Sequence, residues 1–210
     1  MAEPVCFYFD PICPWCYQSA RWARRLAELG EVELSWGLFS LEMQNAGTEP
    51  EEMARAHARS ASALRTVVVV RDHGGAAAVG AFYAALGRRV HEQGQDLDAV
   101  ETLEASLVDA GLDVALLEQA TSDPSTLERV GDEHRALCER TRSFGVPTIV
   151  LDGGDGPAIF GPVISEVPDD ADAVELWHHV RWLARYGNFS ELKRDRSSAP
   201  DLESVRRAHR

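Results

Sequence analysis

The first forty residues contain two apolar runs separated by an amphipathic stretch. Val5 to Asp10 is rich in aromatic and β-branched residues, which is typical of a buried strand, and Val32 to Phe39 shows the same texture. Between them, apolar positions recur at helical spacing from Pro14 to Leu29, and Gly30 follows as a stop signal. This pattern predicts a strand, a helix and a second strand.

A long block without strand texture comes next, after a loop marked by Asn45 and Pro50. The block runs from Glu51 to about Ala120 and is rich in alanine. It predicts four helices: Glu51 to Asp72, Ala76 to Glu92, Asp98 to Ala110 and Val114 to Ala120. Val67 to Val70 favours a strand by propensity, but the surrounding alanines and flanking arginines favour a helix.

Strand texture returns in the last third of the chain. The pattern predicts a helix over Ser125 to Ser143, a strand over Ile149 to Leu151, a hairpin turn over Gly153 to Gly156, a strand over Ala158 to Phe160 and a helix over Ala171 to Tyr186. The residues after Gly187 are polar and carry clustered arginines, so we expect an arm or a solvated tail there.

Two cysteines stand where the first predicted strand gives way to the first helix, as Cys13-Pro14-Trp15-Cys16. Unpaired N–H groups and the positive end of the macrodipole at a helix N-terminus favour the thiolate, which is the attacking form of cysteine. Pro14 suits the first helical turn. We therefore expect a redox dithiol in which Cys13 attacks and Cys16 resolves. Two core cysteines or half of a zinc site are the alternatives.

The two other cysteines, Cys6 and Cys138, lie in apolar patterns and are predicted to be core residues. A structural zinc site needs four ligands, usually as two spaced pairs. The sequence has no second pair to accompany Cys13 and Cys16, so we predict no metal site.

Composition narrows the class of protein. The 210 residues are 45% hydrophobic and can fill a core. A net charge of −13 argues against nucleic-acid and anionic-membrane partners. The N-terminus has no signal-peptide pattern, and no apolar run is long enough to span a bilayer. We expect a cytoplasmic protein, and in that compartment a dithiol is catalytic rather than structural.

The order of elements, with Cys13-Pro14-Trp15-Cys16 at the first helix and Val146-Pro147-Thr148 before a later strand, resembles thioredoxin-fold proteins of the DsbA type. The resemblance implies an α/β fold with an all-helical domain, 46–120, inserted between the second and third strands. Residues 1–45 and 121–190 would form the discontinuous thioredoxin-like domain, and 191–210 a basic tail. It also implies that Pro147 is cis and lies against the dithiol, where the backbone at Val146 pairs with substrate.

Further motifs resemble the actinobacterial mycothiol-dependent nitroreductase family. They are Phe9-Asp10-Pro11, Ser40-Leu41 with Asn45, Leu86 to Gly94, Phe160-Gly161-Pro162-Val163 and Glu191 to Arg194. The similarity implies a cytosolic reductase that takes electrons from mycothiol and can reduce some nitro-aromatic compounds. It also implies that Trp15, Asn45 and His91 line the pocket beside Cys13. The chain departs from the family between Asn45 and Arg71, where it has no aromatic residue.

The same residues also have a direct physical interpretation. Trp15 offers an apolar face but no positive charge, so the helix terminus must stabilise the thiolate, and we expect a weakly oxidising disulfide. This favours a reductase over an oxidase. His91 is either a proton donor or charge partner in the site, or a histidine on a solvated helix face. Asn45 alone indicates a loop residue.

The sequence contains no flavin or nicotinamide fingerprint, so we expect no tightly bound cofactor, and any nitro reduction must use the thiols and a small thiol such as mycothiol. Expected partners are that small thiol and a small-molecule or disulfide substrate; a solvent-facing helical insertion is compatible with a homodimer.

Two other functions stay open: a thiol-assisted isomerase and a non-catalytic metal- or thiol-binding protein. Cys16 speaks against the isomerase, which needs no resolving thiol.

Overall fold

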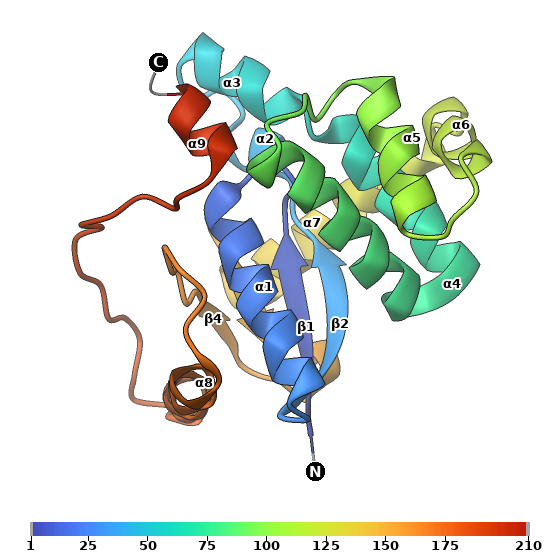
Figure 1. Cartoon of the computed structure of the whole chain (residues 1–210). Coiled ribbons are helices and arrows are strands. Elements are labelled where there is room, and N and C mark those ends of the chain that lie inside the picture. The colour runs from blue at the N-terminus through green and yellow to red at the C-terminus, as the bar shows by residue number, and fades with distance from the viewer. Residues whose placement is uncertain (1, 209–210) are drawn as a thin grey trace.

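A four-stranded mixed sheet forms the centre of the protein, whose computed structural model describes residues 2–208 (Figure 1). β1 (Glu3–Phe9) pairs in parallel with β2 (Val32–Leu38), and α1 (Pro14–Glu28) connects them. β3 (Thr148–Val150) is antiparallel to β1, and β4 (Ala158–Phe160) is antiparallel to β3. The strand order β2-β1-β3-β4 confirms the predicted α/β fold. Residue 1 of the predicted first segment and residues 209 and 210 of the predicted tail lie outside the described residues.

The segment between β2 and β3 is helical, as expected. Its elements are α2 (Leu41–Asn45), α3 (Glu51–Ala58), α4 (Ala61–Gly87), the π-helical turn η1 (Arg88–Glu92), α5 (Val100–Asp109), α6 (Ala115–Ser122) and α7 (Ser125–Thr141). The four valines from Val67 to Val70 are helical because three of them, Val67, Val68 and Val70, are buried in this layer, and burial outweighs strand propensity. The boundaries of the two predicted domains stay a prediction.

One of the predicted helix boundaries is wrong. The helix expected over Glu51 to Asp72 is broken between α3 and α4, where the Ser60 hydroxyl donates to the carbonyl of His57 (3.0 Å) and ends the first helix. The break expected between Asp72 and Ala76 is confirmed: Gly74 and Gly75 leave helical geometry, and α4 consists of two helices joined across this kink. Gly75 takes a φ of 64°, a conformation that glycine adopts at little cost, so the chain bends there and resumes its helix.

Helices cover both faces of the sheet. In Figure 1 α1 lies in front of the sheet, α7 lies behind it, and α8 (Asp170–Arg185) is seen end-on at the lower left, where it packs against α1 and β4. On the front, the Trp22 indole donates to the carbonyl of Ala173 (3.1 Å). On the back, Glu133 of α7 accepts from the backbone N–H of Leu38 in β2 (2.8 Å). The sheet is therefore buried on both sides, as its apolar strands require.

An aromatic cluster joins β1, β2 and α4. The ring of Phe9 stacks on that of Tyr83 at 3.9 Å between centroids. Trp36 presents its edge to Phe7, Phe9 and Tyr83 at 5.7, 5.8 and 5.6 Å. β1 runs directly into the cysteine motif. The cluster therefore packs α4 against the strand that leads to the two thiols.

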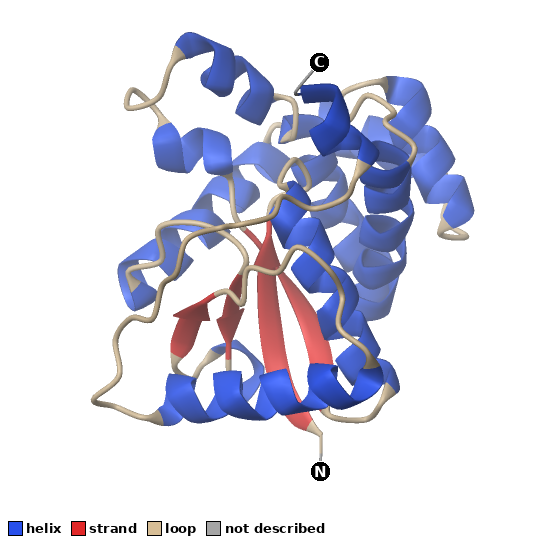
Figure 2. Cartoon of the chain, turned by 60° about the vertical axis from the view of Figure 1, so that its left-hand side comes forward, coloured by secondary structure: helices blue, strands red, loops and turns tan. Residues whose placement is uncertain are grey.

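The C-terminal segment forms an arm along one side of the molecule (Figures 1 and 2). The chain after α8 has no regular structure up to the short α9 (Glu203–Ala208), which packs against η1. Leu202 is only 3% exposed, and the Arg207 guanidinium donates to the carbonyl of Gly94. The expected solvated tail is therefore wrong for the end of the arm, because burial of Leu202 holds it down.

Candidate active site

Cys13 caps the N-terminus of α1 and lies above Cys16. Its backbone has the extended angles of an N-cap, φ −81° and ψ 111°, and Pro14 follows inside the first turn. The Cys13 sulfur accepts a hydrogen bond from the backbone N–H of Cys16 (3.4 Å). Cys13 is half-buried, whereas Cys16 is 0% exposed, and both are free thiols. One accessible thiol above a buried one is the arrangement that attack and resolution require.

The environment of Cys13 disfavours its thiolate. Burial raises the pKa of Cys13 to about 11, although the N–H groups of Cys16 and Trp15 act in the opposite direction. The nearby carboxyl of Asp10 raises this pKa further. The sequence led us to expect the helix N-terminus to favour the thiolate; in the structure the loss of solvation outweighs that effect.

Asp10 is a site residue that the sequence analysis did not identify. It is fully buried at the end of β1, and its carboxylate accepts from the N–H groups of Ile12 (3.1 Å) and Leu41 (2.8 Å). Burial raises the pKa of Asp10 to about 6. The carboxylate thus ties the loop before the dithiol to the start of α2. The sequence feature that could have identified Asp10 is an acidic residue at the end of a buried strand, shortly before the cysteine motif.

His91 is buried beside the dithiol loop. It is 1% exposed, and its Nε2 lies 2.9 Å from the carbonyl of Pro11, so Nε2 donates. Its Nδ1 then accepts from the hydroxyl of Ser204 in α9 (3.0 Å). Burial lowers the pKa of His91 to about 4, so the ring is neutral at pH 7. The expectations of a surface histidine and of a charge partner are both wrong; His91 connects the dithiol loop to the arm.

The arm brings a positive charge to Trp15. The guanidinium carbon of Arg196 lies 4.9 Å from the centre of the Trp15 ring, which is a cation–π contact. The same charge lowers the pKa of Cys13, against the larger effect of burial. The sequence analysis found no cation at this position, because Arg196 is far from the motif along the chain and only folding brings it there.

The proline motif lies beside the dithiol. The Val146–Pro147 peptide bond is cis, as the resemblance implied. Because Tyr8 pairs with Thr148, Pro147 stands next to the end of β1 that leads into Cys13. A second cis bond, Gly161–Pro162, was not expected; the carbonyl of Pro162 accepts from the Ser19 hydroxyl of α1 (2.6 Å).

Asn45 belongs to α2 and Cys138 to α7. Asn45 is the last residue of α2, not a loop residue, and its amide donates to the carbonyl of Leu41 (2.8 Å). Cys138 is half-buried, with its sulfur 3.6 Å from Gln44 and 3.8 Å from His134. Cys6 is a core residue, as predicted.

The part of the chain that the structure describes contains neither a metal-binding cluster nor a membrane-spanning helix. Between residues 2 and 208, no group of three or more His, Cys, Asp or Glu side chains is arranged to hold a metal ion. No helix within the same residues is both long enough and apolar enough to cross a membrane.

The fold and the dithiol define a thioredoxin-fold thiol-dependent oxidoreductase of the thiol-disulfide class. A family model described as "Rv2466c-like: Mycothiol-dependent nitroreductase Rv2466c" matches residues 12–194, and the chain belongs to this family. A relative, the "Uncharacterized protein Rv2286c" of Mycobacterium tuberculosis (strain ATCC 25618 / H37Rv), is 32% identical over 203 residues, which cover 96% of this chain and 85% of the relative.

Solved structures show the same fold at low sequence identity. The cytosolic disulfide reductase DsbM from Pseudomonas aeruginosa with GSH has a TM-score of 0.61 at 16% identity, covering 85% of this chain and 99% of that one. The probable DsbA oxidoreductase SCO1869 from Streptomyces coelicolor has a TM-score of 0.56 at 21% identity, covering 95% and 97%. A 2-hydroxychromene-2-carboxylate isomerase has a TM-score of 0.59 at 20% identity, covering 85% and 94%.

Proposed function

We propose that this protein is a mycothiol-dependent reductase that works through Cys13 and Cys16 and accepts nitro-aromatic compounds among its substrates. The observation that carries the proposal is the placement of a half-buried Cys13 sulfur at the N-terminus of α1 above a fully buried Cys16. Membership of a family described as mycothiol-dependent supports the choice of reductant.

The proposed cycle on a disulfide substrate is balanced in atoms and electrons. The Cys13 thiolate attacks one substrate sulfur, forms a mixed disulfide and releases the other sulfur as a thiolate. The Cys16 thiolate then attacks the Cys13 sulfur, and the second substrate sulfur leaves. Two molecules of mycothiol return two electrons and two protons to the Cys13–Cys16 disulfide and leave as their own disulfide.

The raised pKa of Cys13 supports reduction over oxidation. A dithiol is a strong oxidant in its disulfide form when its thiolate is greatly stabilised. Here burial raises the pKa of Cys13 to about 11, so its reduced form gains little from ionisation at neutral pH. The Cys13–Cys16 disulfide should therefore be weakly oxidising, and the dithiol should readily give up electrons.

In this proposal the neighbours of the dithiol bind the substrate. Trp15 offers a flat apolar ring to an aromatic compound. The support for Asn45 and the neutral His91 as further pocket residues is the family resemblance. The backbone at Val146, next to the cis Pro147, pairs with the substrate. We place the protein in the cytoplasm without a nucleic-acid or membrane partner, since a reducing compartment keeps such a dithiol reduced. The homodimer stays a prediction.

The isomerase alternative is less well supported. A thiol-assisted isomerisation involves no net redox change, so it does not need a resolving thiol. In this chain the backbone N–H of Cys16 donates to the Cys13 sulfur, and the Cys16 thiol is fully buried. This arrangement serves disulfide exchange.

Re-reduction of the oxidised protein tests the proposal. The protein is oxidised and then incubated separately with mycothiol, glutathione or thioredoxin, and the Cys13–Cys16 disulfide is followed by thiol alkylation and mass. We expect mycothiol to reduce it selectively, and consumption of a nitro-aromatic compound with mycothiol to stop in Cys13→Ser. Cys138→Ser is the matched control and should behave as wild type. If no disulfide forms, or mycothiol leaves it intact, the proposal is wrong.

A further inference from the structure

Two polar side chains near Cys16 are buried without hydrogen-bond partners. Among residues 2–208, the Nε and Nη2 atoms of Arg24 and the hydroxyl of Tyr83 have no formed hydrogen bond. Tyr83 is 1% exposed. Buried donors are nearly always paired in folded proteins, and an unpaired one costs roughly 1–3 kcal/mol, more for a charged group. The pair therefore needs an explanation beyond packing.

The geometry places these groups around the resolving thiol. Tyr83, from α4, stacks on Phe9 at the end of the strand that leads into the dithiol loop, and its hydroxyl lowers the pKa of the Cys16 thiol against the larger effect of burial. Arg24 follows Cys16 by about two turns of α1. Its guanidinium carbon lies 4.9 Å from the centre of the Tyr83 ring and 5.0 Å from that of Trp36. A donor and a cation thus lie together behind Cys16.

Arg24 also has a path to solvent on its other side. It lines a cavity of about 510 Å³ between α1, α4 and the segment before α8, together with Tyr17 and Arg21. Burial lowers the pKa of Arg24, but a guanidinium remains charged at neutral pH. A Cys16 thiolate would attract this guanidinium and raise the pKa of Arg24, whereas burial lowers it. The side chain is therefore a permanent positive charge behind the buried thiol.

Resolution of a mixed disulfide requires a Cys16 thiolate, and a thiolate is the species that a nearby donor and cation stabilise. Cys16 must lose its proton before it can attack, yet burial raises the pKa of Cys16 well above its usual range, and a charged Cys13 or Asp10 raises it further. A buried thiolate needs a donor and a nearby cation to offset the lost solvation. In the reduced protein the neutral Cys16 thiol donates to the carbonyl of Tyr8 (3.8 Å), and the Arg24 and Tyr83 donors have no formed hydrogen bond.

We propose that Tyr83 and Arg24 stabilise the Cys16 thiolate during resolution, with Tyr83 as the hydrogen-bond donor to sulfur and Arg24 as a positioning residue that acts through the Tyr83 ring. This inference rests on the proposed dithiol chemistry. The Cys16 proton leaves to solvent, the Cys16 sulfur bonds to the Cys13 sulfur, and the bond between Cys13 and the substrate sulfur breaks, so that the substrate leaves as a thiolate. Tyr83 keeps its own proton.

A neutral aromatic disulfide, 2,2′-dithiodipyridine, separates the two steps. Reduced protein releases one absorbing thione when Cys13 attacks and a second when Cys16 resolves the mixed disulfide. The reaction is followed in a Cys138→Ser background, which removes the other half-buried thiol. An uncharged probe is used so that loss of an arginine does not change its binding by charge.

We expect Tyr83→Phe, which keeps the ring stacked on Phe9, to slow the second release about tenfold at pH 7 and to leave the first within twofold. Arg24→Met should slow the second release similarly and move its pH midpoint upward by about one unit, since tenfold in rate corresponds to one pKa unit. Arg24→Lys should restore most of the rate. Arg21→Met, on the exposed side of the same helix, is the matched control and should have no effect.

The outcomes separate the two proposals. If wild type releases one thione and forms no Cys13–Cys16 disulfide, the proposed function fails. If wild type resolves normally and both variants resolve at the wild-type rate, the role of Tyr83 and Arg24 is overturned. It is also overturned if the variants slow both releases equally, because that result indicates general damage to the fold.

Discussion

At Cys13 two local effects oppose each other. The helix N-terminus supplies N–H donors that stabilise a thiolate, and the sulfur accepts one of them, from Cys16. Burial removes water from the same sulfur and raises the pKa of Cys13 to about 11. Desolvation wins because water solvates a thiolate better than two peptide dipoles do. Reactivity at this residue therefore depends on how the surroundings exclude water.

Alkylation kinetics test this balance directly. We expect the rate of Cys13 alkylation by iodoacetamide to rise about tenfold per pH unit from pH 7 through pH 9, because only the thiolate reacts and its pKa is about 11. An ordinary thiol begins to level off near its pKa of about 8.5. Site-resolved mass spectrometry measures the rate at Cys13. A plateau below pH 8 would contradict the expectation.

His91 makes a second prediction at the residue scale. Its pKa is about 4 in the folded protein, against 6.5 for an unperturbed histidine. A lowered pKa means that its contribution to stability is complete above pH 6.5 and is lost as the pH falls towards 4. Between pH 7.5 and 5.0, wild type should lose about 2 kcal/mol more unfolding free energy than His91→Gln.

Urea unfolding at the two pH values gives this difference. The opposite titration of Asp10, whose pKa is raised to about 6, is present in both proteins and cancels in the comparison. Equal losses in wild type and His91→Gln would show that His91 is not held neutral by burial.

At the scale of elements, the C-terminal arm is the main unexpected feature. Its middle places Arg196 over Trp15, and its end places Ser204 against His91. Leu202 is the apolar residue that holds the arm between these contacts. The arm therefore contributes to the site although it has little regular structure (Figure 2).

Undocking the arm should be measurable by proteolysis. Leu202→Asp removes the burial of a leucine, worth about 2 kcal/mol, and places a charge in an apolar contact. Trypsin should then cut after Lys193, Arg194 or Arg196 several-fold faster than in wild type. Leu192→Asp is the matched control, because Leu192 is exposed on the same arm. Equal cleavage rates in the two variants would show that Leu202 does not hold the arm.

The positive charge of Arg196 on the arm should have a small effect on the reactivity of Cys13. Arg196→Gln should slow Cys13 alkylation at pH 7.5 about two- to threefold, because the guanidinium lowers the pKa of Cys13 from an exposed position where water screens it. Arg196→Lys should keep most of the rate. Arg194→Gln serves as the control, and an equal effect of both neutral variants would contradict a specific role for Arg196.

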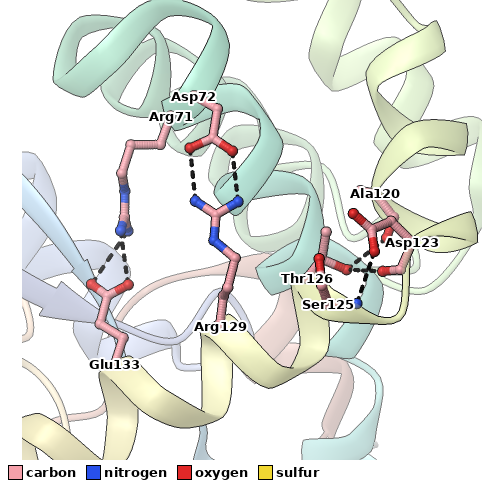
Figure 3. A network of polar contacts seen from close by, with 8 residues as sticks. All are labelled: Arg71, Asp72, Ala120, Asp123, Ser125, Thr126, Arg129 and Glu133. Atoms are coloured by element: carbon pink, nitrogen blue, oxygen red, sulfur yellow. Dashed lines mark hydrogen bonds and ion pairs between the residues drawn. The ribbon is translucent and has the colours of Figure 1, made fainter.

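At the scale of the whole molecule, one carboxylate joins the helical layer to the sheet. Glu133 of α7 accepts two hydrogen bonds from the Arg71 guanidinium of α4, at 2.8 and 3.3 Å (Figure 3). It also accepts from the N–H of Leu38 in β2. Beside it, Arg129 and Asp72 form an exposed pair at 2.6 Å. The pair of Glu133 and Arg71 is half-buried and is linked to β2, whereas the pair of Arg129 and Asp72 is exposed and joins only α7 and α4.

Unfolding measurements distinguish the two pairs. Glu133→Ala should cost about 2 kcal/mol of unfolding free energy, because it leaves the buried N–H of Leu38 and the half-buried Arg71 without their acceptor. Arg129→Ala should cost less than about 1 kcal/mol, as exposed ion pairs do. Similar losses in both variants would mean that Glu133 contributes no more than a surface pair.

Much of the fold could be predicted because it follows from local patterns. The strand at Val5, the helix from Pro14 and the helical block after Asn45 each follow from periodicity and turn residues within a few positions. Helix boundaries were less accurate: the single helix expected over Glu51 to Asp72 is divided between Ala58 and Ala61, because the hydrogen bond from the Ser60 hydroxyl to the His57 carbonyl competes with the helix.

The sequence by itself determined where the two thiols stand and which one caps the helix, because helix capping, apolar period and motif spacing act over short stretches of chain. The cis Pro147 came only from the family resemblance, and the structure confirms the cis bond. Only the tertiary structure decided how these groups ionise. The pKa of Cys13 and His91 depends on which atoms exclude water, and the positions of Asp10, Tyr83, Arg24 and Arg196 around the dithiol result from contacts between distant segments. Solvation and charge at a site are properties of all the neighbours, which no local pattern contains.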